Sequence, residues 1–80
     1  MILTPKEKEK KKKYVEILRD AFTFDERSGV VDMRYEVIDM PDVYEENVKV
    51  FFEGGGLRRV NVTGDSCQGM YIDIGRAVYG

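Results

Sequence analysis

Histidine is absent from this chain of 80 residues, and cysteine occurs only once, as Cys67. Without histidine the chain has no Ser-His or Cys-His nucleophile pair, no histidine-based metal site and no general base that titrates near neutral pH. A single cysteine forms no internal disulfide, which fits a reducing cytosol, and it cannot build a structural zinc site alone. We therefore expect a non-enzymatic protein with no cofactor and no metal site.

Long apolar runs are missing as well. No run of about 18 apolar residues occurs, so we expect no membrane span. The N-terminus is lysine-rich where a signal peptide has its apolar core, so we expect a cytoplasmic protein. The formal net charge of −2 disfavours nucleic acid as a partner. A chain of this size hides only about 60% of its unfolded surface, which leaves little room for a deep cleft.

What the chain does contain is a regular order of elements in a single domain, residues 1–80. Thr4, Pro5 and Glu7 form a helix start, with a cap, a proline at the first helical position and a capping-box carboxylate. Glycines 54–56 predict a hairpin turn, and the acidic stretch 39–47 reads as a nine-residue loop. The predicted elements are a helix over 4–22, strands over 30–38, 48–53 and 57–63, and a helix over 65–79.

These elements predict an α+β fold, an α-β-β-β-α two-layer sandwich with a three-stranded antiparallel sheet and both helices on one face. The strand order stays open between 1-2-3 and an order with the third strand in the middle. Apolar residues at period two predict the buried face of the first strand, and those at helical spacing predict the buried stripe of the second helix. These residues are Val31, Met33, Tyr35 and Val37, and then Cys67, Met70, Tyr71, Ile74 and Val78.

The lysine-rich stretch 6–13 contains no apolar residue. We expect this end of the first helix to project into water and fray. The alternative is electrostatic attraction to phosphate or to an acidic partner. Nucleic-acid binding through this stretch predicts a steep salt dependence, and removal of residues 1–13 should then abolish binding and leave the fold intact.

The junction 63–67 connects a strand to a helix through a glycine-containing turn. Free backbone N–H groups at a helix N-terminus form an anion site, and an oligomer could pair such ends around a small anionic ligand such as a nucleotide. The ligand-binding residues would be Arg58, Arg59, Thr63 and Ser66. The alternative is that Asp65 or Ser66 is simply the N-cap. Cys67 is either a reactive thiol or a small buried hydrophobic residue.

Two further surfaces suit a protein partner. On the back of the second helix, Gly69 and Gly75 lie near Ile72 and Tyr79, which permits close approach of another chain, including a second copy, or of a neighbouring element of the same chain. On the open sheet face an aromatic residue is surrounded by charges, as at a binding hot spot, and the acidic loop adjoins it. The predicted partner-binding residues are Tyr44, Glu45, Glu46, Phe51, Ile72 and Tyr79.

The helix-strand-strand-strand-helix order resembles the double-stranded RNA-binding domain. That family grips phosphates with lysines at the start of its second helix, whereas the matching stretch here is Gly64-Asp65-Ser66-Cys67-Gln68-Gly69. The segment 60–66, with an Ile- and Ala-containing closing helix, is also similar to short uncharacterised proteins of bacteriophages and their bacterial hosts. This resemblance implies a mobile-element accessory protein that inhibits a host defence protein.

The leading hypothesis is a small cytosolic interaction protein that acts through its acidic and aromatic surface, or through the back of its second helix. The alternative is an oligomeric binder or sponge of an anionic ligand at the junction 63–66.

Overall fold

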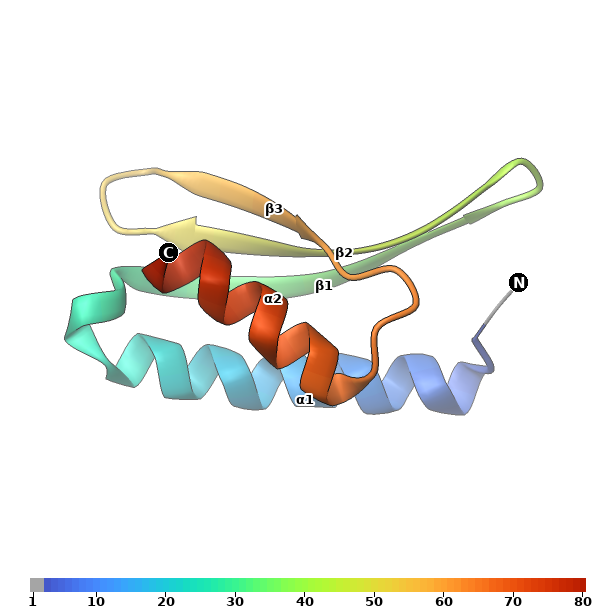
Figure 1. Cartoon of the computed structure of the whole chain (residues 1–80), viewed down its shortest axis with the longest axis horizontal. Helices are drawn as coiled ribbons and strands as arrows, with labels where there is room; N and C mark the ends of the chain where they lie inside the picture. The colour runs from blue at the N-terminus through green and yellow to red at the C-terminus, as the bar shows by residue number, and fades with distance from the viewer. Residues whose placement is uncertain (1–2) are drawn as a thin grey trace.

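The computed structural model describes residues 3–80 and has two layers, a three-stranded sheet and two helices on one side of it (Figure 1). All strands pair antiparallel in the order β1-β2-β3. This confirms the predicted α+β fold and places the second strand in the middle. The elements are α1 (Pro5–Phe24), the 3-10 turn η1 (Glu26–Ser28), β1 (Val30–Met40), β2 (Val43–Phe52), β3 (Leu57–Asn61) and α2 (Cys67–Tyr79).

The first helix begins as predicted. The Thr4 hydroxyl accepts a hydrogen bond from the Glu7 N–H at 3.2 Å, and the Glu7 carboxylate accepts one from the Thr4 N–H at 3.2 Å. The expectation that the lysine-rich end projects into water is wrong for Lys11, which is buried and lies on the same stripe as Val15 and Leu18. At its other end α1 continues two residues beyond the predicted end, to Phe24.

The first two strands form a hairpin where a nine-residue loop was expected. The predicted loop over 39–47 is wrong, because the strands continue to a two-residue turn at Pro41 and Asp42, next to the pair Met40 and Val43. Proline presets the φ angle that the first central position of such a turn needs. The third strand pairs only with residues 47–51 of β2. Residues 37–46 therefore project beyond β3 (Figure 1), by roughly 13 Å, and we call them the arm.

A register shift at the start of β1 changes which residues face the helices. The pairing of β1 with β2 is irregular between Val30 and Asp32. Val30 and Met33 are buried as a result, whereas Val31 is 55% exposed. The prediction that Val31 faces the core is therefore wrong, because the extra residue of a bulge shifts the alternation of the strand.

The core lies between the sheet and the two helices. On α2 the prediction holds for Met70 and Ile74, which are fully buried, but not for Tyr71, which is 52% exposed beside the core. β3 ends at Asn61, before the predicted end, yet Val62 stays buried and its N–H donates to the Glu46 carbonyl at 2.8 Å. The core residues are Val15, Leu18, Phe22, Val30, Met33, Val48, Val50, Val62, Met70 and Ile74. Each large side chain of this kind stabilises the fold by about 1.5–3 kcal/mol when fully buried.

The β2–β3 turn follows the sequence pattern. Gly54 and Gly55 have φ angles of 88° and 94°, which residues with a side chain rarely adopt.

Across residues 3–80, neither helix combines the length and the apolar character that a membrane crossing requires.

Candidate functional site

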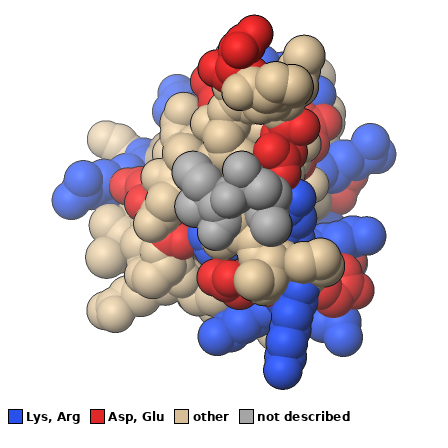
Figure 2. Space-filling view, turned by 90° about the vertical axis from the view of Figure 1, so that its right-hand side faces the viewer, with Lys and Arg blue, Asp and Glu red and all other residues tan. Residues whose placement is uncertain are grey.

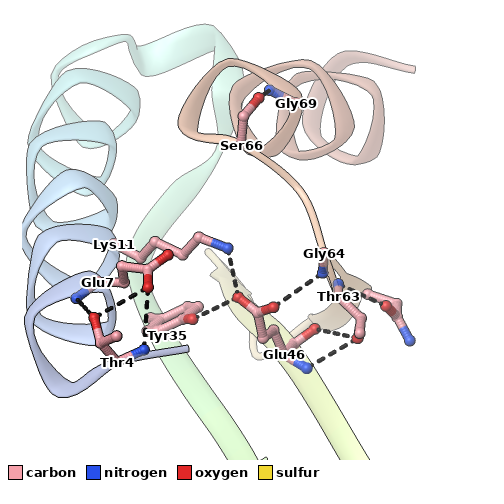
Figure 3. A network of polar contacts seen from close by, with 10 residues as sticks. Thr4, Glu7, Lys11, Tyr35, Glu46, Thr63, Gly64, Ser66 and Gly69 are labelled. Atoms are coloured by element: carbon pink, nitrogen blue, oxygen red, sulfur yellow. Dashed lines mark hydrogen bonds and ion pairs between the residues drawn. The ribbon is translucent and has the colours of Figure 1, made fainter. Parts of the chain in front are cut away.

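The carboxylate of Glu46 is the centre of a buried polar network (Figure 3). Glu46 is fully buried, and its Oε1 accepts hydrogen bonds from Lys11 Nζ and from the Tyr35 hydroxyl, each at 2.7 Å. Its Oε2 accepts a third from the Gly64 N–H at 2.9 Å. Burial alone would raise the pKa of Glu46, but the hydrogen bonds from Lys11, Gly64 and Tyr35 outweigh it and hold the pKa below its ordinary value.

This network joins α1, β1, β2 and the loop before α2. The expectation that Glu46 is a surface residue for a partner is therefore wrong: its charge is neutralised inside the molecule by Lys11. Sequence reasoning missed Lys11, although a signal existed, because position 11 continues the buried stripe of Val15, Leu18 and Phe22 at helical spacing. Burial and the nearby Glu46 carboxylate also raise the pKa of the Tyr35 hydroxyl.

Two other predicted acidic and aromatic residues lie on the arm, half-buried. Tyr44 points its hydroxyl into the molecule, where it is buried and finds no hydrogen-bond partner among the described residues. Burial raises the pKa of Tyr44 to about 12. Glu45 lies across from Ile38 in the β1–β2 pairing and makes no ion pair within residues 3–80. Of the acidic residues in the stretch 39–47, Asp42 and Glu45 are thus the two that make no ion pair within residues 3–80.

Phe51 lies half-buried on the sheet face that the helices leave open. The Arg34 guanidinium lies 5.5 Å from its ring centroid, within the range of a cation–π contact. Leu57 is its neighbour on β3 and is 52% exposed. On this face the Phe51 ring is thus partly covered by Arg34.

Ile72 lies midway along α2 and Tyr79 at its end, and both line one groove beside Phe22 of α1. The Tyr79 ring lies 5.7 Å from the Phe22 ring, and its hydroxyl donates to Asp25 Oδ2 at 2.5 Å. This groove of about 400 Å³ runs along α2 and is largely apolar. Its lining residues are Phe22, Tyr71, Ile72, Gly75, Arg76, Tyr79 and Gly80, and we call it the helix groove.

Sequence reasoning placed Tyr71 in the buried stripe of the second helix and so missed its part in the helix groove. Tyr71 lies at the border of its helix stripe, whereas Phe22 is a buried core residue that also lines the groove. Tyr71 is 52% exposed, Ile72 is 45% exposed and Tyr79 is 56% exposed. Three large exposed side chains around one concave apolar surface are typical of an interaction site.

The two glycines of α2 have different surroundings. A Cβ atom at Gly69 would lie 3.3 Å from the Asp65 side chain, so this glycine accommodates a residue of the same chain. A Cβ atom at Gly75 would meet nothing within 4 Å, and Gly75 lines the helix groove. Only Gly75 therefore keeps open a surface that another chain could approach.

The residues of the predicted anion site do not converge. Ser66 is the N-cap, and its hydroxyl accepts the Gly69 N–H at 3.1 Å. The Thr63 hydroxyl accepts the Glu46 N–H at 2.9 Å. Arg58 lies near the other end of α2, where its guanidinium donates to the Ala77 carbonyl at 2.8 Å. Arg59 is exposed on β3 and pairs across the sheet with Lys49.

A second hollow, of about 630 Å³, lies between the start of α1 and the start of α2. Cys67 lines it and is half-buried. The hydrogen bond with Asp73, burial and the repulsion of that second carboxylate raise the pKa of Asp65, which also lines the hollow, to about 6. The full lining is Leu3, Glu7, Lys10, Lys11 and residues 64–68, and we call this the basic hollow.

No protein-family model, curated protein or solved structure matches this chain. A function for it therefore has to be inferred from the helix groove, the arm and the basic hollow themselves.

Proposed function

We propose that this chain is a non-enzymatic protein-binding domain that holds a partner in the helix groove. The observation that carries the proposal is the gathering of Tyr71, Ile72 and Tyr79, all about half exposed, around an apolar groove of about 400 Å³. Rigid aromatic rings provide large contact area at low cost in side-chain entropy, and hot spots of interfaces are rich in them.

The surroundings of the groove support a preformed site. The hydrogen bond from Tyr79 to Asp25 and the packing of its ring against Phe22 hold one wall in place before any partner arrives. A partner then loses little affinity to the ordering of this wall. The absence of a side chain at Gly75 leaves room for an apolar anchor of the partner. Binding of a host defence protein, which the resemblance to phage proteins implies, would be one instance of this role.

The test compares groove variants by affinity capture from cells, with quantification of each captured protein. Gly75→Leu fills the groove from a position where a Cβ atom meets nothing, and Ile72→Asp places a charge on its rim. Val31→Asp is the matched control, because Val31 is an exposed apolar residue outside the groove. We expect a partner that is captured by the wild type and by the control and lost by both groove variants. A set of captured proteins that is the same for all four chains would contradict the proposal.

A further inference from the structure

The end of the molecule opposite the helix groove carries two surfaces that the proposed function does not use. Figure 2 shows this end: acidic side chains gather at the top, where the arm lies, and basic side chains extend from both sides and from the bottom. Within residues 3–80 two ion pairs join the arm to α1, namely the buried pair of Lys11 with Glu46 and the pair of Lys8 Nζ with Asp39 Oδ2, at 3.2 Å.

The arm presents an apolar face with free acidic residues. Cross-strand pairing and alternation place Ile38, Met40, Val43 and Glu45 on one face of the hairpin. Met40 is 61% exposed and Val43 is 45% exposed. Asp42 at the turn and Glu45 make no ion pair within the described chain. The arm is therefore a protruding apolar tip with two uncompensated negative charges.

The lysines in and beside the basic hollow are complementary in charge to the acidic residues of the arm. Lys10 lines the hollow, and Lys6 and Lys13 flank it on α1 at i−4 and i+3. None of these three lysines pairs with an acid in the part of the chain that the structure describes. Lys11 contributes no free charge, because Glu46 neutralises it.

Two acidic residues also line the hollow, and they decide how the arm would enter. Glu7 Oε1 is held by the Thr4 N–H at 3.2 Å and the Thr4 hydroxyl at 3.0 Å, and Asp65 packs against Gly69. Negative charges of the arm would be repelled from this floor. The uncharged Met40 side chain is not repelled by these carboxylates and can enter the hollow. Asp42 and Glu45 of the arm would then lie beside the unpaired lysines of α1.

We propose that a second copy of this chain docks at this end, with the arm of each copy in the basic hollow of the other. Because arm and hollow lie at the same end of the molecule, a twofold axis forms both contacts at once and closes the assembly as a dimer. The ion pair of Lys8 with Asp39 already joins a lysine of α1 to an acidic residue of the arm within one chain. The dimer leaves the helix groove free, so this inference stands independently of the proposed function.

The first test reverses the charges of each surface in turn and measures dimerisation by native mass spectrometry and by light scattering. The lysine variant carries Lys6→Glu, Lys10→Glu and Lys13→Glu, and the arm variant carries Asp42→Lys and Glu45→Lys. We expect the wild type to form dimers at low salt that weaken at high salt. Each variant alone should dimerise at least about tenfold more weakly, because its two surfaces then have the same sign. An equimolar mixture of the two variants should restore dimers, of mixed mass.

A matched control changes the same number of charges elsewhere. Lys12→Glu, Arg27→Glu and Arg59→Glu replace exposed cations outside the basic hollow, and this triple variant should keep the wild-type dimerisation constant within about twofold. All substituted residues are exposed except the half-buried Glu45, so thermal unfolding of every variant verifies that it is folded.

The second test is a cross-link at the proposed contact. Met40→Cys places a thiol on the arm tip, and Cys67 lines the hollow that the tip would enter in the second copy. We expect mild oxidation to give a disulfide-linked dimer that is lost when Cys67→Ser is added. Glu53→Cys, in the turn after β2 and outside the hollow, should give no such increase over the wild type.

Four results would overturn the proposal. They are a wild type that stays monomeric at low salt and high concentration, a dimer that neither charge variant weakens, a variant mixture that stays monomeric, and a dimer that Ile72→Asp abolishes. The last result would place the second copy in the helix groove instead.

Discussion

At the scale of single residues, the carboxylate of Glu46 shows how a buried charge is retained. It accepts three hydrogen bonds, and its cation, Lys11, has a side chain that is only 10% exposed. Removal of one partner from such a pair leaves an uncompensated buried charge, whereas removal of both partners costs much less.

We therefore predict that Lys11→Met lowers the free energy of unfolding by about 3 kcal/mol or more, because Glu46 loses its counter-charge. The double variant Lys11→Met with Glu46→Met should be less destabilised than the sum of the two single variants. Urea denaturation of the four chains measures this coupling. Single-variant effects that simply add would mean that the two side chains do not interact.

The pH dependence of stability provides a second test of the contribution of Glu46 to the fold. Its pKa is lowered in the folded state from an ordinary value of 4.5, so the unfolded chain binds a proton first as pH falls. The stabilisation by Glu46 is therefore present above pH 4.5 and is lost as pH falls through the folded pKa. In Glu46→Gln this part of the acid dependence should disappear, which unfolding measured from pH 3 to pH 7 would detect.

For Asp65 the pH dependence of stability has the opposite sign. Its pKa is raised to about 6, first by the hydrogen bond with Asp73 and then by burial. The folded state binds the Asp65 proton more tightly than the unfolded chain does. The stabilisation of the fold by the protonated Asp65 is therefore fully present below pH 3.8, the ordinary pKa, and is lost as pH rises through about 6. We predict that Asp65→Asn stabilises the fold at pH 7 by roughly 1 kcal/mol and has less effect at pH 4. Equal melting temperatures for the two chains at pH 7 would contradict this assignment.

At the scale of elements, the two glycines of α2 provide a matched pair. Both lie inside a helix, where glycine is about 1 kcal/mol less favourable than alanine. Gly75→Ala should stabilise the chain by about 0.5–1 kcal/mol, because its Cβ atom meets nothing within 4 Å. Gly69→Ala should gain less or lose stability, because its Cβ atom lies 3.3 Å from Asp65. Thermal unfolding of the two variants should separate them, and a larger gain at position 69 than at 75 would contradict the geometry.

The elements also show which parts of the structure were predictable from the sequence. The helix start at Thr4, the glycine turn after β2 and the order of the elements depend on local chemistry, and they were predicted correctly. The arm was mistaken for a loop, because acidic residues are unfavourable in strands unless something neutralises them. For Glu46 that partner is Lys11, which is 35 positions away in the chain, and no local pattern reveals a contact at that distance.

Only part of the helix groove could be predicted from the sequence, for a similar reason. Ile72 and Tyr79 lie away from the core stripe, so helical spacing alone places them outside. The apposition of Phe22 with Tyr79 depends on how α1 and α2 cross, which is a property of tertiary packing and not of either helix. The anion site failed because hydrogen bonds within the chain already occupy its groups, and Arg58 reaches Ala77 at the opposite end of α2.

At the scale of the whole molecule, charge is unevenly distributed along the chain. Residues 6–13 hold six lysines and two glutamates, within a chain whose net charge is −2. The sequence alone presents this stretch as a removable basic tail. In the structure the same stretch begins with the capping box of α1 and includes Lys11, the cation of the buried network. It is therefore part of the fold.

Removal of residues 1–13 should accordingly unfold the chain, in contrast to the expectation from sequence. The truncation takes away Lys11 and leaves Glu46 buried without its cation, at a cost of about 3–5 kcal/mol. That is a large share of the total of about 5–15 kcal/mol that stabilises an ordinary domain. The lysine variant of the dimer test keeps Lys11 and so should still unfold cooperatively near the wild-type temperature. Circular dichroism during heating distinguishes the two chains, and a truncated chain that melts as cooperatively as the lysine variant would show that this end of α1 is dispensable for the fold.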